Sequence, residues 1–353
     1  MRGVARVGLL VLLVASLALT VLTGMQIARQ PLLRPLIERT ADEISAATDR
    51  MMAVEATPDH IAARLTELLA EDPRNWIALQ AVRDVATERS TQLPNHVQAA
   101  YDTAWGADSA YFTQAVSCLT CVWDAGTCSL SQALICQAPV AFTPIGDIAG
   151  IARAGVAYAS GGEIDDVDLA LSITGLGATA LVVASGGSST TVKLGAGLAK
   201  LARKMHLLSP RLVAMISDTL RAGVDLAALP AIRSTDDLAR VIKADALAPL
   251  ARLTTDLGRI NDAIGPTQAL HLLRYVDDGT DARRLANAAD ALKSRTIGRI
   301  EILGKTRLLR ATLRWSDEVY ALMAGIAGLI ASVTSLIASL VHSIVIRTLR
   351  RRI

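Results

Sequence analysis

Two long uncharged stretches at opposite ends of the chain dominate its hydrophobic pattern. Residues 7–28 are 22 residues without a charge, and residues 319–346 are 28. As helices they reach about 33 and 42 Å, against a hydrocarbon core of about 30 Å. We therefore predict two transmembrane helices. The first is interpreted as a signal anchor, because its apolar run continues past Ser16-Leu17-Ala18, a poor cleavage site.

Between these stretches, apolar residues recur at helical spacing and no strand-like alternation persists. Thr57 and Ser209 each precede a proline, which is typical of a capping residue followed by the first position of a helix. Asp72 before Pro73 predicts another helix start in the same way. Further helices are expected over residues 247–257, 266–276 and 281–292. The predicted fold class is all-α.

The hydrophobic pattern divides the chain into eight parts around a body of residues 29–318. They are a cytoplasmic N-terminus (1–6), a transmembrane signal anchor (7–28), the helical N-terminal part of the body (29–108), a cysteine block (109–137), a Gly-rich hydrophobic hairpin (138–205), the helical C-terminal part of the body with a basic juxtamembrane helix (206–318), a second transmembrane helix (319–346) and a basic cytoplasmic tail (347–353).

Charge is distributed unevenly over these parts. The chain has a net charge of +3 and a mean hydropathy of +0.38. All 33 acidic residues and 30 of the 36 basic residues lie in the body, so the body carries −3 and the two tails carry +6. Phosphate binding needs a strongly basic face, and stacking on bases needs aromatic residues, which are only 3% of the chain. No nucleic-acid partner is therefore expected.

The basic tails also bear on orientation. Four arginines lie within the last seven residues, which favours a cytoplasmic C-terminus by the positive-inside rule. Two spans then place the N-terminus there as well, and the body in the periplasm of a bacterial inner membrane. Basic residues on the body side of both spans weaken this bias, but long domains translocate largely regardless of charge.

The cysteines form the tightest local cluster, a C-x2-C-x6-C-x7-C pattern made of Cys118, Cys121, Cys128 and Cys136. In an oxidising compartment, four cysteines imply two disulfides with three pairings. A turn-like Asp124-Ala125-Gly126 favours Cys121–Cys128 with Cys118–Cys136 outside it. The same four thiols bound to zinc are an alternative, and a redox-active C-x-x-C is a third. Apart from zinc, no cofactor is expected.

No catalytic residue can be nominated from motifs. Gly175-Leu176-Gly177 begins a G-x-G-x-x-A pattern, but no acidic residue lies between Asp168 and Asp218 to hold a ribose. Gly298 followed by Gly304-Lys305 has one residue too many for a phosphate-binding loop. The five histidines form no ligand pair, and packing or surface roles are expected for them.

Each transmembrane stretch carries a row of small residues at every fourth position, and such rows let helix backbones approach closely. The frequency of these residue types in the chain is the simpler explanation, and it stays open. The rows are Ser16, Thr20, Gly24 and Ala28 in the first stretch, and Ala327, Ala331, Ser335, Ser339 and Ser343 in the second.

The Gly-rich block contains the uncharged run 169–192, but only residues 169–184 are densely apolar. Sixteen residues make about 24 Å of helix, which is short for a third span. We expect instead a buried hairpin of residues 148–160 against 169–184, capped by Asp147 and Asp168. The later segment 293–315 is rich in basic residues and is expected as an amphipathic helix, on either the membrane surface or the solvated face of the body.

Two resemblances concern the middle of the chain. The cysteine pattern, then Pro144-Ile145-Gly146-Asp147 and the Gly-rich run to Lys200, together resemble a block of uncharacterised proteobacterial two-span membrane proteins. That resemblance implies a two-span architecture and brings no activity with it. The Pro144–Asp147 motif with its Gly-rich hydrophobic helix is also similar to pre-toxin segments of bacterial polymorphic toxins, although no recognisable toxin domain follows.

These observations lead to one function and two alternatives. The first is a non-enzymatic two-span inner-membrane protein whose helical periplasmic body binds a protein partner or the membrane surface. One alternative is a membrane-permeabilising or toxin-related protein that uses the Gly-rich block. The other is a membrane-tethered zinc or thiol-redox protein. The expected partners are the lipid bilayer and a second copy of the chain or another membrane protein.

Overall fold

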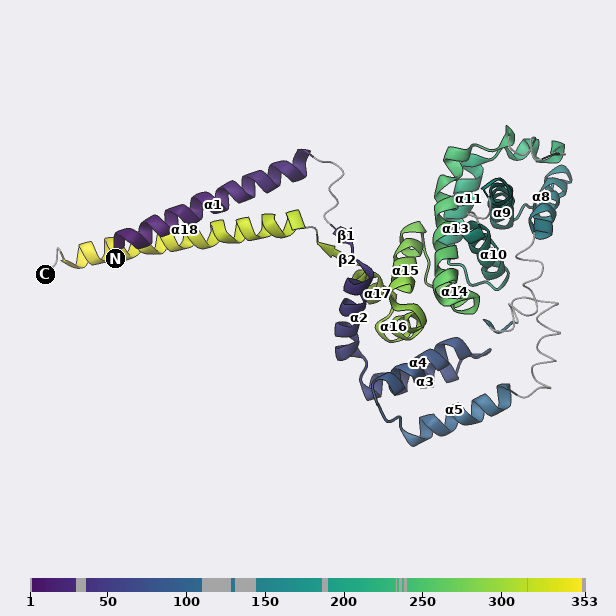
Figure 1. Cartoon of the computed structure of the whole chain (residues 1–353), viewed down its shortest axis with the longest axis horizontal. Coiled ribbons are helices and arrows are strands. Elements are labelled where there is room, and N and C mark those ends of the chain that lie inside the picture. The colour runs from purple at the N-terminus through teal and green to yellow at the C-terminus, as the bar shows by residue number, and fades with distance from the viewer. Residues whose placement is uncertain are drawn as a thin grey trace. The chain divides into compact units, whose positions relative to one another are not determined.

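The computed structural model describes residues 2–29, 36–109, 128–130, 144–185, 190–232, 234, 237, 240–315 and 317–350. The chain forms two compact units, which are treated separately below. The first, the helix-pair unit, contains Met1–Arg39 and Leu313–Ile353, and the second, the body, contains Thr40–Thr312. The body boundaries thus lie about ten residues inside the expected 29 and a few residues inside the expected 318. The described residues are mostly helical (Figure 1), which confirms the all-α prediction.

The elements follow each other along the chain without long strands. The helix-pair unit contains α1 (Arg2–Arg29), β1 (Leu36–Glu38), β2 (Leu313–Trp315) and α18 (Asp317–Arg350). The body contains α2 (Ala41–Glu55), α3 (Pro58–Leu69), α4 (Trp76–Glu88), α5 (Asn95–Asp108), α8 (Pro144–Ala159), α9 (Asp166–Ser185), α10 (Thr190–Lys204), α11 (Pro210–Gly223), η2 (Leu226–Ala231), α13 (Ala244–Ile264), α14 (Pro266–Leu273), α15 (Gly279–Leu292), η3 (Lys293–Arg295), α16 (Thr296–Leu303) and α17 (Lys305–Ala311).

Side-chain caps fix several helix starts. Thr57 and Ser209 accept hydrogen bonds from backbone N–H groups in the first turns of α3 and α11, with proline at the first helical position, as predicted. The start predicted at Asp72 is wrong, because α4 begins at Trp76. Asn75 caps α4 instead, and its side chain accepts from the backbone N–H of Ala78.

Two hydrophobic cores lie within the body. The larger core joins α8–α11 with α13–α15, and the smaller joins the second half of α2 with α3, α4 and α5. α16 contributes to both, with Ile297 and Ile300 in the larger core and Ile302 and Leu303 in the smaller. In Figure 1, α16 lies between α15 on one side and the α3–α4 pair on the other. This helix therefore connects the two halves of the body.

The burial of α16 corrects the prediction of an amphipathic surface helix over residues 293–315. Every residue from Thr296 to Leu303 is buried, and the segment is broken at Gly304 and ends in β2. The charge of Arg299 is tolerated inside because its guanidinium donates to Glu88 and Asp49. Gly298 permits a close contact with α4, since a Cβ there would lie 2.9 Å from the Ala81 carbonyl oxygen.

The Gly-rich block folds into α8 packed against α9, in agreement with the predicted hairpin, and continues into α10, which packs on both α9 and α13. α9 is the buried partner, whereas α8 exposes Ile145, Ile148 and Val156 to the surface. The predicted caps are wrong. Asp165 caps α9, because its carboxylate accepts from the N–H groups of residues 167 and 168, and Asp147 lies inside α8.

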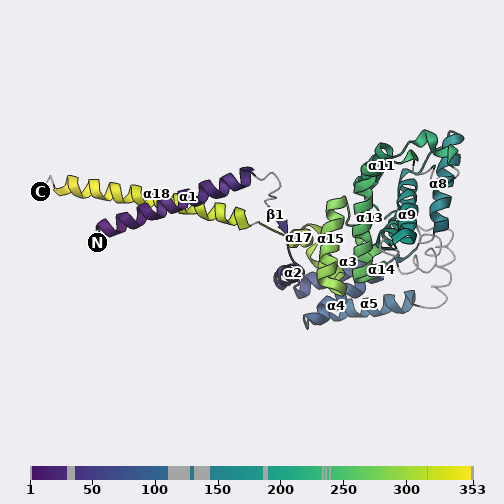
Figure 2. The same ribbon diagram turned by 45° about the horizontal axis from the view of Figure 1, so that its top comes forward.

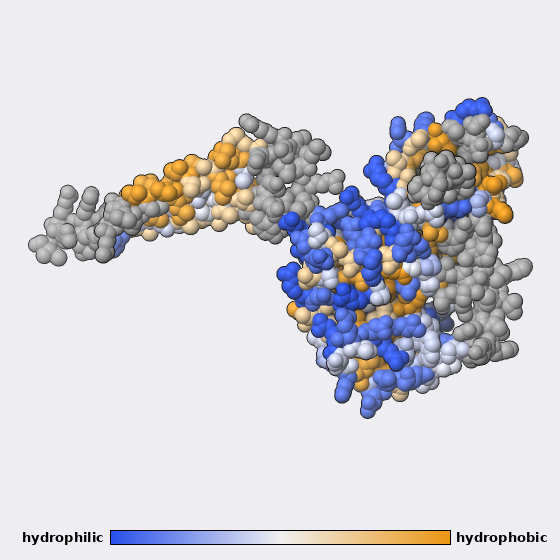
Figure 3. All heavy atoms as spheres, viewed as in Figure 1, coloured by the Kyte–Doolittle hydropathy of each residue, from blue (hydrophilic) through white to orange (hydrophobic). Residues whose placement is uncertain are grey.

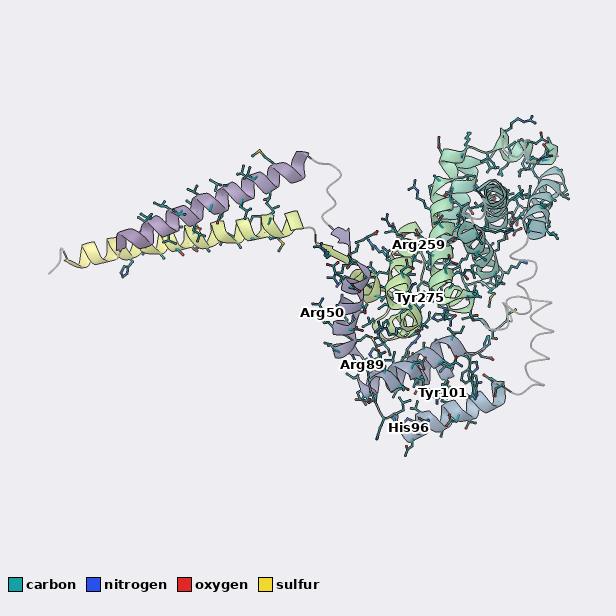
Figure 4. All side chains as sticks on the ribbon, in the orientation of Figure 1. Arg50, Arg89, His96, Tyr101, Arg259 and Tyr275 are labelled. Atoms are coloured by element: carbon teal, nitrogen blue, oxygen red, sulfur yellow. The ribbon has the colours of Figure 1, made fainter. Side chains whose placement is uncertain are left out.

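In the larger core, a close backbone contact joins α10 to α13, and an arginine joins α13 to α15. A Cβ at Gly195 of α10 would lie 1.8 Å from the Thr254 carbonyl oxygen of α13, so these helices approach more closely than any side chain at that position would permit. Arg259, labelled on α13 in Figure 4, donates to Asn287 and Asp290 and so ties α13 to α15.

Candidate membrane-anchoring helix pair and polar clusters

The helix-pair unit brings the two ends of the chain together. α1 and α18 lie side by side and antiparallel in both ribbon views, with the N- and C-termini at the same end (Figures 1 and 2). At the opposite end of the pair, β1 and β2 form a two-stranded antiparallel sheet that pairs Leu36 with Trp315 and Glu38 with Leu313. The all-α prediction did not include this short sheet, because three-residue strands leave no alternating pattern.

Small and polar side chains occupy the contact between the two helices. Ser16 and Thr23 of α1 and Ser332 of α18 are buried there. A Cβ at Gly328 would lie 2.3 Å from the Ser16 hydroxyl, and a Cβ at Gly325 would lie 2.5 Å from the Thr20 hydroxyl. The two glycines therefore allow the helices a separation that larger residues would prevent.

The predicted small-residue rows coincide with this contact only in part. Ser16 and Thr20 lie in it, whereas Ala327, Ala331 and Ser335 are exposed and Ser339 is half-buried. The burial of Gly24, Ala28 and Ser343 is not among the features that the structure describes. The reason is geometric: residues four apart drift by about 40° per step around a helix, while alternating steps of three and four keep to one side.

Three hydroxyl groups at the contact donate hydrogen bonds within their own helices. Thr20 donates to the Ser16 carbonyl oxygen at 2.8 Å, and Thr23 donates to that of Leu19 at 2.6 Å. Ser332 donates to the Gly328 carbonyl oxygen in the same way. Such bonding to the preceding turn lets a polar side chain lie in an apolar medium without a water partner.

The outer surface of the pair is hydrophobic, as the orange atoms of Figure 3 show. Ten large apolar side chains of α1 and seven of α18 are exposed among the described residues. They are Val7, Leu10, Val11, Leu12, Val14, Leu17, Leu19, Val21, Leu22 and Met25 in α1, and Met323, Ile326, Ile330, Val333, Ile337, Leu340 and Val341 in α18. This arrangement is the reverse of a helix pair in water, which buries its large apolar residues and exposes its polar ones.

By length and composition, one helix in the described part of the chain suits a membrane span, over Ala321–His342 of α18. In α1 the apolar stretch so described is shorter, Leu9–Thr23, although the helix itself extends from Arg2 to Arg29. Of the two predicted spans, the second is therefore long and apolar enough to cross a membrane, and the first is too short over the described residues.

Of the four cysteines, Cys128 belongs to the described residues, where it is disulfide-bonded and buried. Cys118, Cys121 and Cys136 lie outside the described residues, so the pairing Cys121–Cys128 with Cys118–Cys136 stays a prediction. No group of three or more potential metal ligands occurs among the residues that the structure describes. Since three of the cysteines are not among them, the zinc alternative is untested.

A buried polar network in the body is the arrangement closest to a catalytic one. His271 of α14 is fully buried, and its Nε2 lies 2.8 Å from Glu301 Oε1 of α16. Its Nδ1 lies 2.9 Å from the amide nitrogen of Asn75. Tyr275, labelled in Figure 4, donates to the same Glu301 oxygen, and Arg64 of α3 donates to the other at 2.6 Å.

The protonation states follow from these contacts. The Asn75 oxygen accepts from the Ala78 N–H, so its amide donates to His271 Nδ1 and the imidazole proton lies on Nε2. Burial lowers the pKa of His271, which keeps the ring neutral. Burial raises the pKa of Glu301, but the hydrogen bonds from His271 and Arg64, together with the Arg64 charge, outweigh it and lower that pKa to about 2.

Both nitrogens of this histidine are thus occupied by protein groups, and neither ring edge reaches solvent. The network holds four helices, since Arg64 comes from α3, Asn75 from the start of α4, His271 from α14 and Glu301 from α16. It therefore joins these helices inside the body. Local spacing in the chain does not reveal this network, because its members are up to 237 residues apart.

A second buried charge pair belongs to the Pro144–Asp147 motif. The carboxylate of Asp147 in α8 accepts from the ammonium of Lys200 in α10, and both side chains are 5% exposed. Burial raises the pKa of Asp147, and the Lys200 charge opposes this rise. Gly175 of α9 lies against the carboxylate, because a Cβ there would be 2.7 Å from it. Gly175, the first glycine of the G-x-G-x-x-A pattern, therefore makes room for the Asp147 carboxylate.

No family model, no curated protein and no solved structure matches this chain. The geometry of the helix pair and of the body is therefore the basis for the functional proposals below.

Proposed function

We propose that the chain is a membrane-anchored, non-enzymatic binding protein. In this proposal α1 and α18 cross a bacterial inner membrane together, both termini lie in the cytoplasm, and the body in the periplasm binds a protein partner or the membrane surface. The disulfides of the cysteine block would then stabilise a secreted body. A second copy of the chain or another membrane protein is the expected partner within the bilayer.

This proposal rests on the helix pair, in which large apolar side chains are exposed and small polar ones are buried. Exposure of one large aliphatic side chain to water costs about 1.5–3 kcal/mol relative to its burial. Seventeen large apolar side chains face outward in the pair, while Ser16, Thr23 and Ser332 are buried at the contact between the helices. Thr20, Thr23 and Ser332 donate to their own helices. Hydrocarbon is the solvent that favours this arrangement, because lipid tails solvate the aliphatic surface and small residues supply the helix contact.

The antiparallel arrangement supports the proposed orientation. Both ends of the chain are at the same end of the pair, and both carry arginines, two near the N-terminus and four near the C-terminus. Six positive charges on one side of a two-helix hairpin are what the positive-inside rule associates with the cytoplasm. The body would then leave and rejoin the bilayer at the opposite end, where β1 pairs with β2.

Reporter fusions and extraction test the two parts of this proposal. A fusion of alkaline phosphatase after Thr91 should be active, and one at Ile353 should be inactive, because the enzyme matures only in the periplasm. The full chain should stay in the membrane pellet in alkaline carbonate. A soluble chain would contradict the anchor, and active enzyme at Ile353 with none at Thr91 would contradict the orientation.

One observation favours a second function, membrane permeabilisation. α8 carries Ile145, Ile148 and Val156 on its exposed face, and α9 is a 20-residue apolar helix packed behind it. Release of a fluorescent dye from vesicles by the purified chain would support this function, and intact vesicles would exclude it. The zinc or thiol-redox alternative is tested by thiol counting: four free thiols with one bound zinc would replace the disulfide reading.

A further inference from the structure

A cavity of about 590 Å³ lies in the body between α8 and η2. Its volume is within the range of small-molecule sites, about 300–1,000 Å³. Leu176 of α9 closes one part of the wall, and Leu229, Pro230 and Ile232 form the wall opposite α8. The described lining residues of α8 are Ile148, Ile151, Ala152, Gly155, Val156 and Ala159.

The sequence of α8 explains why a hollow forms here. Its lining residues recur at steps of one, three and four, which places them on one side of the helix. Three branched and three small residues share that side, and the small ones leave space between α8 and η2. At Gly155 a Cβ would lie 3.6 Å from the Leu229 carbonyl oxygen, an ordinary contact that fixes one edge of the cavity.

The charges of α8 are turned away from the cavity and neutralised. Asp147 pairs with Lys200 inside the body, and Arg153 donates to Asp168 of α9 at 2.8 Å. No ionisable or aromatic residue occurs among the described lining residues. This described part of the wall therefore matches a neutral aliphatic group and gives a charged or planar one nothing to pair or stack with.

The single polar side chain of the described wall is already used. Ser234 Oγ donates to the Asp237 carboxylate at 3.0 Å and accepts from the backbone N–H of Asp237 at 3.2 Å. A ligand in the cavity thus gains apolar contact from the wall and little directional hydrogen bonding. Ile148 and Val156 are 56% and 69% exposed, so a ligand would remove a large aliphatic surface from water.

We propose that this cavity binds the hydrocarbon chain of an acyl ligand. A free fatty acid and the tail of a membrane phospholipid share this chemistry, and the experiment below separates the two sources. The cavity lies wholly within the body, so the inference does not depend on the proposed anchoring by α1 and α18.

Photolabelling of the full chain tests the site. In the first arm, the chain is held in amphipol without free detergent and exposed to a photoreactive palmitic acid. In the second arm, it is reconstituted in phosphatidylcholine vesicles that contain a photoreactive acyl chain. Mass spectrometry should find label on peptides that cover α8 and η2 in at least one arm. Label in amphipol assigns a free fatty acid as a source, and label in vesicles alone assigns the lipid.

Two exposed residues on the same helix provide matched variants. Ile148 lines the cavity, whereas Ile145 is 75% exposed on α8 and does not line it. We expect Ile148→Ser and Val156→Ser each to lower labelling of α8 and η2 at least tenfold, and Ile145→Ser to leave it within twofold. Circular dichroism should show that each variant keeps its helices, because the substituted positions are exposed.

Three results would overturn the proposal. The first is the absence of label on α8 and η2 in both arms. The second is an equal loss of label in Ile145→Ser, which would mean that the outer face of α8 merely touches lipid. The third is unchanged labelling in Ile148→Ser and Val156→Ser. Labelling of α1 and α18 in vesicles reports on the anchor separately, so the two proposals can fail independently.

Discussion

The ion pair of Asp147 and Lys200 offers the sharpest test of the body. It joins α8 to α10, and both side chains are 5% exposed. Asp147→Leu keeps the branched shape of the side chain and removes the charge, and Lys200→Met does the same for the partner. Each single variant leaves one buried charge without its counter-ion, whereas the double variant leaves none.

The expected magnitudes follow from the burial of both groups. Removal of one partner of a buried pair costs about 3–5 kcal/mol, because the remaining charge stays desolvated and unpaired. Replacement of both by apolar residues of similar size is often neutral or stabilising. Since about 1.4 kcal/mol corresponds to a factor of ten, each single variant should open the α8–α10 contact roughly a hundredfold or more.

Hydrogen exchange of the full chain measures this opening, through the exchange rates of amides in α8 and α10. The pair of Arg153 on α8 and Asp168 on α9 provides the matched control, because the Arg153 side chain is 64% exposed and such a pair contributes about 0–1 kcal/mol. Arg153→Met should therefore change exchange less than tenfold.

Two outcomes would refute this reasoning. If Asp147→Leu exchanged at the wild-type rate, the pair would not be buried in the folded chain. If the double variant were as unstable as the single variants, lost packing rather than an unpaired charge would explain the cost.

Three further predictions concern the network, the glycines and the helix pair. Burial lowers the pKa of His271, so below about pH 6.5 the unfolded chain binds a proton that the native state refuses. The free energy of unfolding should then fall by up to about 1.4 kcal/mol per pH unit, and less steeply in His271→Gln, as measured by urea titration between pH 7 and 5. Gly258→Ala should lower the same free energy by about 1–3 kcal/mol, because its Cβ would lie 2.0 Å from the Thr191 carbonyl oxygen, whereas Gly177→Ala, which meets nothing within 4 Å, should not destabilise. Gly328→Val should abolish crosslinking between cysteines introduced into α1 and α18, while Ala327→Val, on the exposed side, should leave it unchanged.

Local signals predicted the local structure well. Thr57 and Ser209 cap their helices because a hydroxyl before a proline fixes the start by itself. The α8–α9 hairpin was visible because glycines separate two apolar helices. Asp147 was misread as a cap for the opposite reason: its partner, Lys200, is 53 residues away, and spacing within one helix contains nothing about it.

In the helix pair, too, local features were predicted from the sequence and contacts between distant segments were not. The two hydrophobic stretches were evident from the sequence, but the face by which each helix contacts the other was not. A row of every fourth residue and a row that alternates steps of three and four differ by only one residue per turn, so the two rows are hard to tell apart. Gly325 and Gly328 were therefore missed. The basic segment around Arg299 was assigned to the surface because its neutralising partners, Glu88 and Asp49, lie more than 200 residues earlier.

The pairing of the first and last helices has a consequence for biosynthesis. Residues 30–316 separate α1 from α18, so α1 is complete long before its partner exists. At about 5–20 residues per second, translation of that interval takes roughly 15 to 60 s. During this time α1 has no partner helix to cover the side that carries Ser16, Thr20 and Thr23. In the proposed membrane anchor, the bonds of Thr20 and Thr23 to their own backbone would satisfy these hydroxyl groups until α18 is made, and the body could fold before the two helices pair.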